Sequence, residues 1–346
     1  ESDGLNTIQD ETMEQRDLDQ LKSERPFSNL TPDFILDAIE SKGFEVDGRL
    51  APLNSYENRV YQLGLHDGGW IVAKFYRPGR WDFNAIQEEH KFLKSLIEDE
   101  LPVVAPLADE NEDTLHQTDE FLWTVFPMMG GHPPELDQSD VLNQLGRLIG
   151  RMHAIGATDK FEHRPEINIE TYGTQPLVYL LQGTWIPEHL KVDYQKSAQL
   201  ALEEVLRCYD RAGDVELQRI HGDCYLGNLI SRHEFLFIVD FDDARMGPPI
   251  QDLWMLNQRT EPQDLGSLYD LLEGYEDFHT FNPRSCHLIE ALRTLRQIHY
   301  AAWIAKRWED PAFPEAFSWF GSDHYWLERI QELETQIERM KVPLFI

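Results

Sequence analysis

The sequence of 346 residues predicts an α+β protein with a small β-rich lobe followed by a larger, mainly helical lobe. Strand-like runs dominate residues 29–126, where a single long helix interrupts them, and helical periodicity dominates residues 132–346. A Pro- and Gly-containing stretch at residues 127–131 separates the two patterns and is predicted to be a hinge. Residues 1–28 are acidic with few aromatic or β-branched residues, which predicts a flexible N-terminal extension.

The first lobe opens with a short helix. Thr31 suits its N-cap, Pro32 its first turn, and Gly43 its end. Strands are predicted at 50–54, 59–63, 70–76 and 121–126, with a hairpin signal in Asp67-Gly68-Gly69 and a long helix over 84–98.

The second lobe shows helical spacing of apolar residues over 141–153, 196–209, 262–278 and 286–308. Its strand candidates are confined to the flanks of residues 221–240. The helix over 286–308 carries basic and aromatic side chains, Arg296 among them, that could line a substrate groove, although aromatic residues at this spacing more often form core.

Composition excludes several classes of protein. Acidic residues number 62 against 31 Lys and Arg, a net charge of −31, which argues against nucleic-acid binding. No run of eighteen apolar residues is present, and the acidic start does not resemble a signal peptide, so no membrane span is expected. Three widely spaced cysteines are typical of reduced thiols in a cytoplasmic protein.

The most informative segment runs from His221-Gly222-Asp223 to Asn228 and is followed by an apolar strand ending in Asp240. Phosphoryl transfer needs a carboxylate that accepts the proton of the attacking hydroxyl, and oxygen ligands that hold Mg²⁺ against the phosphates of ATP. Protein kinases place these groups at the same Asp-x-x-x-x-Asn spacing and at the next strand end. We therefore predict a bilobal, protein-kinase-like fold with Asp223 as catalytic base and with Asn228 and Asp240 as ligands of Mg²⁺.

Neighbouring polar residues are given supporting roles. Asp242 and Asp243 could add metal contacts, but a solvated start of an activation segment is favoured. His221 is expected to brace the loop, Asp252 to cap its helix and anchor the loop, and His153 to be a satisfied core histidine.

Lys74 lies late in the predicted third strand, in Val72-Ala73-Lys74, where protein kinases carry the lysine that contacts the ATP phosphates. A carboxylate on the apolar face of the next helix would be costly without a partner. An ion pair between Lys74 and Glu89 accounts for both residues, with Glu88 as the competing partner.

No Gly-rich loop covers the phosphates. Its place is taken by residues 54–58, in which Ser55 is best placed to present donors to ATP, although Asn and Ser also favour an ordinary hairpin turn.

These motifs resemble the aminoglycoside phosphotransferase/choline kinase superfamily. The general resemblance rests on residues 221–228, 239–244 and Asp252, and a narrower one, to bacterial serine/threonine protein kinases, rests on 52–61, 74–81, 245–256 and 308–314. It spans roughly residues 30–330. It implies a cytoplasmic kinase that uses ATP and Mg²⁺, with Asp223 as proton acceptor, Asn228 and Asp240 as metal ligands and Ser55 at the ATP site.

The resemblance further implies phosphorylation of Ser and Thr in protein substrates during a stress response, the chain itself being one acceptor to test. The alternative is a small-molecule kinase for a cationic alcohol of the aminoglycoside or choline type, which the acidic composition would suit. A pseudokinase is disfavoured because Lys74, Asp223, Asn228 and Asp240 are all present.

Overall fold

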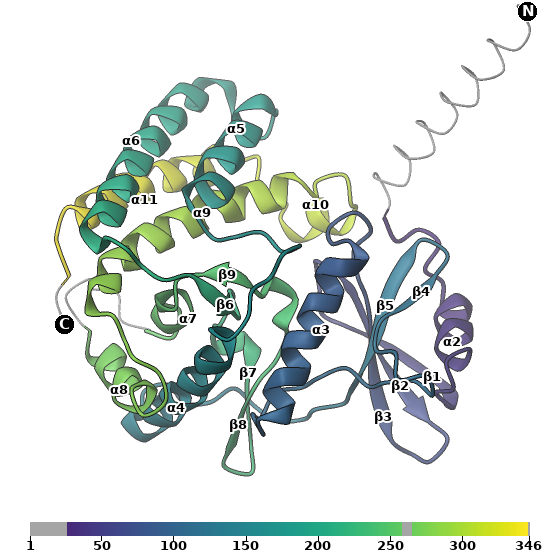
Figure 1. Ribbon diagram of the computed structural model, residues 1–346. Helices are drawn as coiled ribbons and strands as arrows, with labels where there is room; N and C mark the ends of the chain where they lie inside the picture. Colours follow the sequence, from purple (N-terminus) through teal and green to yellow (C-terminus); the bar gives the residue numbers. More distant parts are fainter. Residues whose placement is uncertain (1–25, 258–264, 345–346) are drawn as a thin grey trace, which may run out of the picture. The chain divides into compact units, whose positions relative to one another are not determined.

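The computed structural model describes residues 26–257 and 265–344, which fall into two compact units (Figure 1). Unit 1 contains residues 26–82, 106–128 and 306–318, and unit 2 contains residues 83–105, 129–257, 265–305 and 319–344. Residues 1–25 of the predicted N-terminal extension lie outside the described residues. The chain crosses between the two units more than once, and the crossing between Met128 and Met129 falls within the stretch predicted as a hinge.

Unit 1 is built on an antiparallel five-stranded sheet in the order β1-β2-β3-β5-β4. Its strands are β1 (Val46–Leu53), β2 (Arg59–Leu65), β3 (Trp70–Phe75), β4 (His116–Thr118) and β5 (Phe121–Pro127). The predicted β2–β3 hairpin forms with Gly68 at φ 86°, a left-handed conformation that favours glycine. The Asp67 side chain accepts a 2.8 Å hydrogen bond from the Gly69 N–H and fixes this turn.

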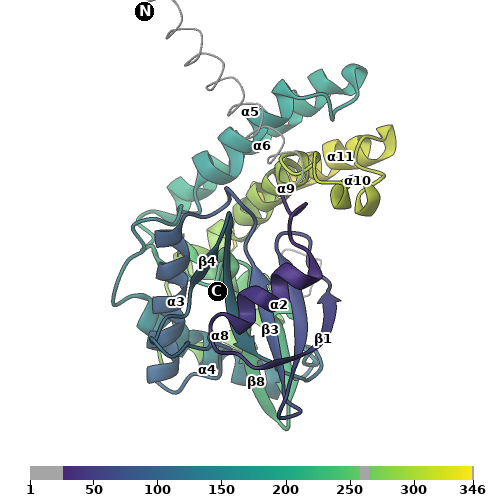
Figure 2. The same cartoon turned by 90° about the vertical axis from the view of Figure 1, so that its right-hand side faces the viewer.

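Helix α2 (Pro32–Glu40) covers one face of this sheet (Figure 2). Thr31 caps it as predicted, since its hydroxyl accepts a hydrogen bond from the Phe34 N–H. Ile35 and Ile39 are fully buried in one core with Phe75 and Trp123 of the sheet. This apolar contact fixes the helix on the sheet.

Unit 1 also contains the segment 306–318, with the short helix α10 (Ala312–Ala316). The buried Asp310 carboxylate accepts a 2.7 Å hydrogen bond from Arg77, and Arg307 pairs with Glu57 at 2.7 Å. Aromatic contacts of Tyr56 with α10 residues reinforce the attachment. The predicted lobes placed this segment with the helices; the ion pairs and ring contacts place it with the sheet.

Unit 2 is mainly helical. Its helices are α3 (Phe83–Glu98), α4 (Ser139–Gly156), α5 (Gln175–Gln182), α6 (Glu188–Ala212), α7 (Ile250–Trp254), α8 (Gly266–Tyr275), α9 (Ile289–Ala305) and α11 (Asp323–Met340), with a π-helix at Glu170–Thr174 and a 3₁₀-helix at Pro283–Leu288. The sequence placed α3 in the first lobe. It groups with unit 2 because Phe92 packs edge-on against Phe161 and Phe241.

Helices α4 and α8 pack closely side by side (Figure 1). Gly146 of α4 allows this approach, because a Cβ there would lie 1.9 Å from the main-chain oxygen of Leu271. The predicted helix over 286–308 begins as the 3₁₀-helix and ends at Ala305, and the first residues of the helix predicted over 262–278 lie outside the described ranges.

Two short antiparallel pairs complete unit 2, namely β6 (Gln218–Ile220) with β9 (Arg245–Gly247), and β7 (Leu229–Arg232) with β8 (Phe235–Ile238). The α+β class is thereby confirmed, with an antiparallel sheet near the N-terminus and a helical remainder. In the described ranges, no helix is both long and apolar enough to cross a membrane.

Candidate active site

The predicted catalytic loop leaves β6 at Ile220 and reaches the 3₁₀-helix Leu226–Asn228. Gly222 has φ 84°, and a Cβ there would lie 2.5 Å from the main-chain oxygen of Asp243. Glycine therefore meets two demands in this loop, a left-handed backbone and close contact with the segment after Asp240.

Asp252 anchors the loop from helix α7. Its carboxylate accepts hydrogen bonds of 2.8 Å from the N–H groups of both His221 and Gly222. Asp252 and His153 are fully buried, and the His153 ring bridges Asp252 and the Tyr275 hydroxyl. The anchoring role and the satisfied core histidine are observed. The capping role is wrong, because Asp252 is the third residue of α7 and its side chain is turned to the loop.

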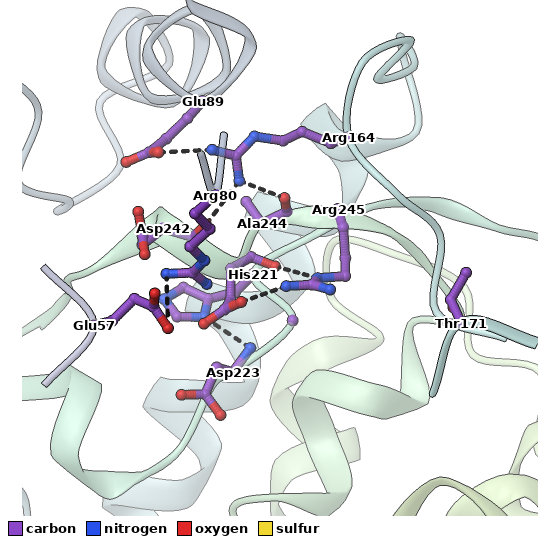
Figure 3. A network of polar contacts seen from close by, with 12 residues as sticks. Glu57, Arg80, Glu89, Arg164, Thr171, His221, Asp223, Asp242, Ala244 and Arg245 are labelled. Carbon is purple, nitrogen blue, oxygen red and sulfur yellow. Dashed lines mark hydrogen bonds and ion pairs between the residues drawn. The ribbon is translucent and has the colours of Figure 1, made fainter. Parts of the chain in front are cut away.

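His221 braces the loop from within (Figure 3). Its Nδ1 accepts the Asp223 N–H at 3.3 Å, so Nε2 carries the ring proton and donates to the main-chain oxygen of Val239 at 2.9 Å. The ring thus connects the predicted base to the strand end that precedes Asp240. These two hydrogen bonds account for His221 without a role in proton transfer.

Asn228 is held between the other two predicted residues. Its side-chain Nδ2 donates a hydrogen bond to the main-chain oxygen of Asp223 at 2.9 Å. Its main-chain oxygen accepts a hydrogen bond from the Val239 N–H at 3.0 Å. Asp240 follows in a left-handed conformation with φ 60°, which is uncommon outside glycine and is concentrated at functional sites. Hydrogen bonds therefore link Asp223, Asn228 and Val239 into one assembly, and Asp240 is the next residue in the chain.

The donor set of this assembly suits Mg²⁺. The amide hydrogen bond to Asp223 assigns Nδ2 of Asn228 as donor and leaves Oδ1 as an acceptor, and Asp240 supplies a carboxylate. Mg²⁺ prefers such oxygen ligands and takes few of them from the protein, with phosphates and water supplying the rest. The described residues contain no group of three or more His, Cys, Asp or Glu side chains that could hold a metal ion.

Asp242 and Asp243, which follow Asp240 closely, differ in how exposed they are. Asp242 is buried, with 4% of its surface exposed, so the expectation that it is solvated is wrong. Arg164 enforces this burial by donating to the main-chain oxygens of Asp242 and Ala244 at 2.9 and 2.7 Å. Asp243 remains partly exposed and pairs with Arg245.

The sequence did not predict that Arg296 would contact Asp223. From helix α9, the Arg296 Nη2 donates to the Asp223 Oδ1 at 2.7 Å. Burial raises the pKa of the Asp223 carboxyl, while the guanidinium of Arg296 acts in the opposite direction and Asp243 adds to the rise. The sequence shows a basic and aromatic helix here, but spacing alone does not show which of its cations faces the loop.

Arg164 also contacts one of the predicted ATP-site residues, as its Nη2 donates to the buried Glu89 carboxylate at 2.8 Å (Figure 3). Glu88 instead accepts the main-chain N–H groups of Glu162 and His163. Within unit 1, Lys74 is buried in β3, with its ammonium 4.9 Å from the ring centre of Tyr76. The Lys74–Glu89 pair stays a prediction, and Arg164 is a partner of Glu89 that the sequence did not indicate.

Ser55 lies in a turn of unit 1 that is firmly held. Its hydroxyl accepts the Asn58 N–H at 3.4 Å, and Arg77 donates to the main-chain oxygens of Tyr56 and Glu57 at 3.1 and 3.0 Å. The guanidinium fixes the path of this turn, and a role of Ser55 in binding ATP stays a prediction.

Sequence comparisons relate this chain to known kinases. The phosphotransferase enzyme family matches residues 49–289. "Stress response kinase A" of Escherichia coli O157:H7 is 42% identical over 316 residues, which cover 91% of this chain and 94% of the relative. A protein of Salmonella typhimurium named "Serine/threonine protein kinase RdoA" is 40% identical over the same shares.

Solved structures show the same fold at low identity. An amicoumacin kinase in complex with AMP-PNP, Ca²⁺ and Ami superposes with a TM-score of 0.68 at 17% identity, covering 90% of this chain and 94% of that one. A microcompartment-associated aminopropanol kinase gives a TM-score of 0.67 at 16% identity, covering 89% and 96%. The family match over most of the chain and the relatives at 40–42% identity lead to one conclusion: the chain belongs to the phosphotransferase enzyme family, as a relative of the stress response kinases A.

Proposed function

We propose that this protein is an ATP- and Mg²⁺-dependent kinase that transfers the γ-phosphate to Ser and Thr hydroxyls of protein substrates in a bacterial stress response. The observation that carries the proposal is the identity of 40–42%, over nearly the whole chain, to kinases named for a stress response and for serine/threonine protein phosphorylation. The arrangement of Asp223, Asn228 and Asp240 supports the phosphoryl-transfer part of the proposal.

In this proposal Asp223 accepts the proton of the attacking hydroxyl. Its position is set by the loop, which Asp252 holds through two main-chain N–H groups and His221 braces from within. A carboxylate fixed in this way orients the hydroxyl for in-line attack without needing to reorganise during the reaction. Burial raises the pKa of Asp223 and makes the carboxylate a better proton acceptor than an exposed one.

Asn228 and Asp240 would hold Mg²⁺. The bound ion would neutralise charge on the β- and γ-phosphate oxygens. The hydrogen bond between Val239 and Asn228 keeps the two ligand positions in register, so the site depends on strand β8 as well as on the loop. Lys74 and Ser55 would contact the phosphates of ATP, as predicted from the sequence.

A cationic small alcohol remains the second candidate acceptor. The solved structures that share the fold act, by their titles, on amicoumacin and aminopropanol, but at 16–17% identity they support the fold alone. The contact between Arg296 and Asp223 weighs against this candidate, because it places a positive charge where a cationic acceptor would approach.

The test is transfer of labelled γ-phosphate with Mg²⁺ to protein acceptors and, in parallel, to aminoglycosides, choline and aminopropanol. The acceptors should include the chain itself and a cell extract, and Asp223→Asn serves as the control. Label on protein serine or threonine that is lost in the variant is the expected result. Label on a small alcohol alone would replace the proposal with the second candidate.

A further inference from the structure

The contact between Arg296 and Asp223 bears on the acceptor, because it places a permanent cation beside the predicted base. Arg296 Nη2 lies 2.7 Å from Asp223 Oδ1, although 73 residues separate the two in the chain. Both side chains reach solvent, with 40% of Arg296 and 27% of Asp223 exposed. An acceptor hydroxyl that approaches Asp223 must therefore come close to the guanidinium.

Helix α9 holds Arg296 in a fixed position. One turn further along this helix, the ring of His299 stacks on the buried Tyr172 with centroids 4.1 Å apart. Tyr172 in turn lies under the guanidinium of Arg245, at 5.3 Å from the ring centre. The cation at the base is thus presented by a packed helix rather than by a loose loop.

Most of the N–H donors of Arg296 have no hydrogen-bond acceptor among the described residues. Within the described ranges Asp223 is its only hydrogen-bond partner, which occupies one of the five N–H donors of a guanidinium. The nearby Asp243 is already paired with Arg245. The open donors match a second carboxylate in the planar, forked geometry that arginine provides.

We propose that Arg296 selects acceptors in which the reacting hydroxyl has a carboxylate close to it, as in a Ser or Thr flanked by Asp or Glu in a polypeptide. A carboxylate on the acceptor bonds the open side of the guanidinium while the hydroxyl takes its place at Asp223. A cationic acceptor is repelled at the same position. The inference rests on the proposed function and narrows it to acidic sequences around the phosphorylated residue.

The experiment compares two serine peptides that differ only in Asp or Asn next to the serine. The wild-type protein is expected to show a kcat/KM at least about tenfold higher for the Asp peptide, a ratio that corresponds to about 1.4 kcal/mol. Arg296→Gln should bring this ratio close to one, and Arg296→Lys should restore part of it. Because the ratio is taken within one protein, a uniform loss of activity or stability cancels.

The matched control is Arg293→Gln, one turn earlier on α9, where the guanidinium pairs with Glu290 and lies over Trp254. This variant should keep the preference for the Asp peptide. An equal preference in wild type and Arg296→Gln, or a wild-type preference for the Asn peptide, would overturn the inference.

A peptide-binding measurement distinguishes failure of this inference from failure of the proposed function. In Asp223→Asn the guanidinium loses its ionic partner, and binding of the Asp peptide by calorimetry should still exceed that of the Asn peptide. The double variant Asp223→Asn with Arg296→Gln should bind both peptides equally. If no peptide is phosphorylated but this difference appears, the proposed function fails and the assignment of Arg296 stands; if the binding difference is missing, the assignment fails.

Discussion

The His153 ring and the Asp252 carboxylate form a fully buried hydrogen-bonded pair, with His153 Nε2 and Asp252 Oδ2 3.0 Å apart. The same carboxylate accepts hydrogen bonds from the main-chain N–H groups of His221 and Gly222, so helix α4 and the predicted catalytic loop share one anchor. Any change at Asp252 should therefore affect both the core and the site.

Replacing Asp252 with Ala should lower the free energy of unfolding by about 3–5 kcal/mol, because three donors lose a buried partner at once. Phosphate transfer should fall as well, since the loop loses its register. Urea denaturation followed by an activity assay on the folded fraction measures both effects. Asp277→Ala, which removes an exposed pair with Arg147, should cost less than about 1 kcal/mol. A fully active, fully stable Asp252→Ala protein would contradict the anchoring role.

Replacing Asp223 with Asn should reduce kcat by roughly 10²–10⁴-fold, the usual contribution of a positioned base. ATP affinity should change little, because the side chain is assigned to the acceptor and not to the nucleotide. Single-turnover transfer and equilibrium titration of ATP separate the two quantities. Wild-type turnover in this variant would remove Asp223 from the role of base.

Asp240 is predicted to act on the nucleotide instead. Asp240→Ala should weaken ATP binding when Mg²⁺ is present and have little effect on ATP binding without it. Because φ at this position is 60°, Ala also adds backbone strain, whereas Asn tolerates the left-handed region. Asp240→Asn is therefore the cleaner variant, and calorimetric titrations with and without Mg²⁺ give the comparison. Equal Mg²⁺ dependence in wild type and variant would exclude the ligand role.

Stability in unit 1 should depend on pH through His116. Burial lowers the pKa of this imidazole below its ordinary value of 6.5, while Asp109 opposes the shift, so the folded state holds the proton less well than the unfolded state. The unfolded state consequently binds more protons as pH drops below about 6.5, and the free energy of unfolding should fall in that range.

Denaturation between pH 5 and pH 8 tests this prediction about His116. His116→Gln should flatten the pH dependence, whereas His66→Gln, at an exposed position of the same unit, should leave it unchanged. If the free energy of unfolding changes with pH equally in His116→Gln and wild type, groups other than His116 cause the pH dependence.

Much of this architecture is readable from local patterns. The β2–β3 hairpin follows from Asp67-Gly68-Gly69, and helix α2 from its Thr31 cap, because turn and cap chemistry act over a few residues. The spacing of Asp223 and Asn228 predicts a loop that the structure closes with a hydrogen bond. Helix α11 went unpredicted, as did strand β4, which is only three residues long.

The parts that the sequence could not predict are long-range electrostatic contacts. Arg296 meets Asp223 across 73 residues, and Arg164 meets Glu89 across 75. The charge of each residue is obvious in the sequence, but its partner is set by how the helices and loops pack. For the same reason, nothing local showed that Asp242 would be buried beneath Arg164.

The ion pair between Asp310 and Arg77 in unit 1 leads to a further prediction about stability. Asp310 and Arg77 are both buried, and Asp310→Ala would remove one of the two carboxylates that pair with the guanidinium, leaving Glu57 at 3.2 Å. The expected cost in the free energy of unfolding is about 1–3 kcal/mol. Arg59 also contacts Asp310, at 3.3 Å, which adds to the loss. Thermal and urea denaturation measure this loss of stability. The control is Asp47→Ala, which removes the more exposed partner of Arg49 and is expected to change stability little. An unchanged unfolding midpoint for Asp310→Ala would contradict this assignment.

The position of Asp310 in the chain also has a consequence for biosynthesis. Arg77 emerges from the ribosome 233 residues before the carboxylate that it binds, an interval of roughly 10–50 seconds at usual rates of translation. The nascent sheet must spend that time without segment 306–318. Arg77 then lacks the Asp310 carboxylate and keeps Glu57 as an ion-pair partner, and the ring of Tyr56 lacks its contacts with Phe313 and Phe317. Fragments that end before residue 306 should therefore aggregate or recruit chaperones, and the native sheet unit should be completed only when synthesis of the chain is almost finished.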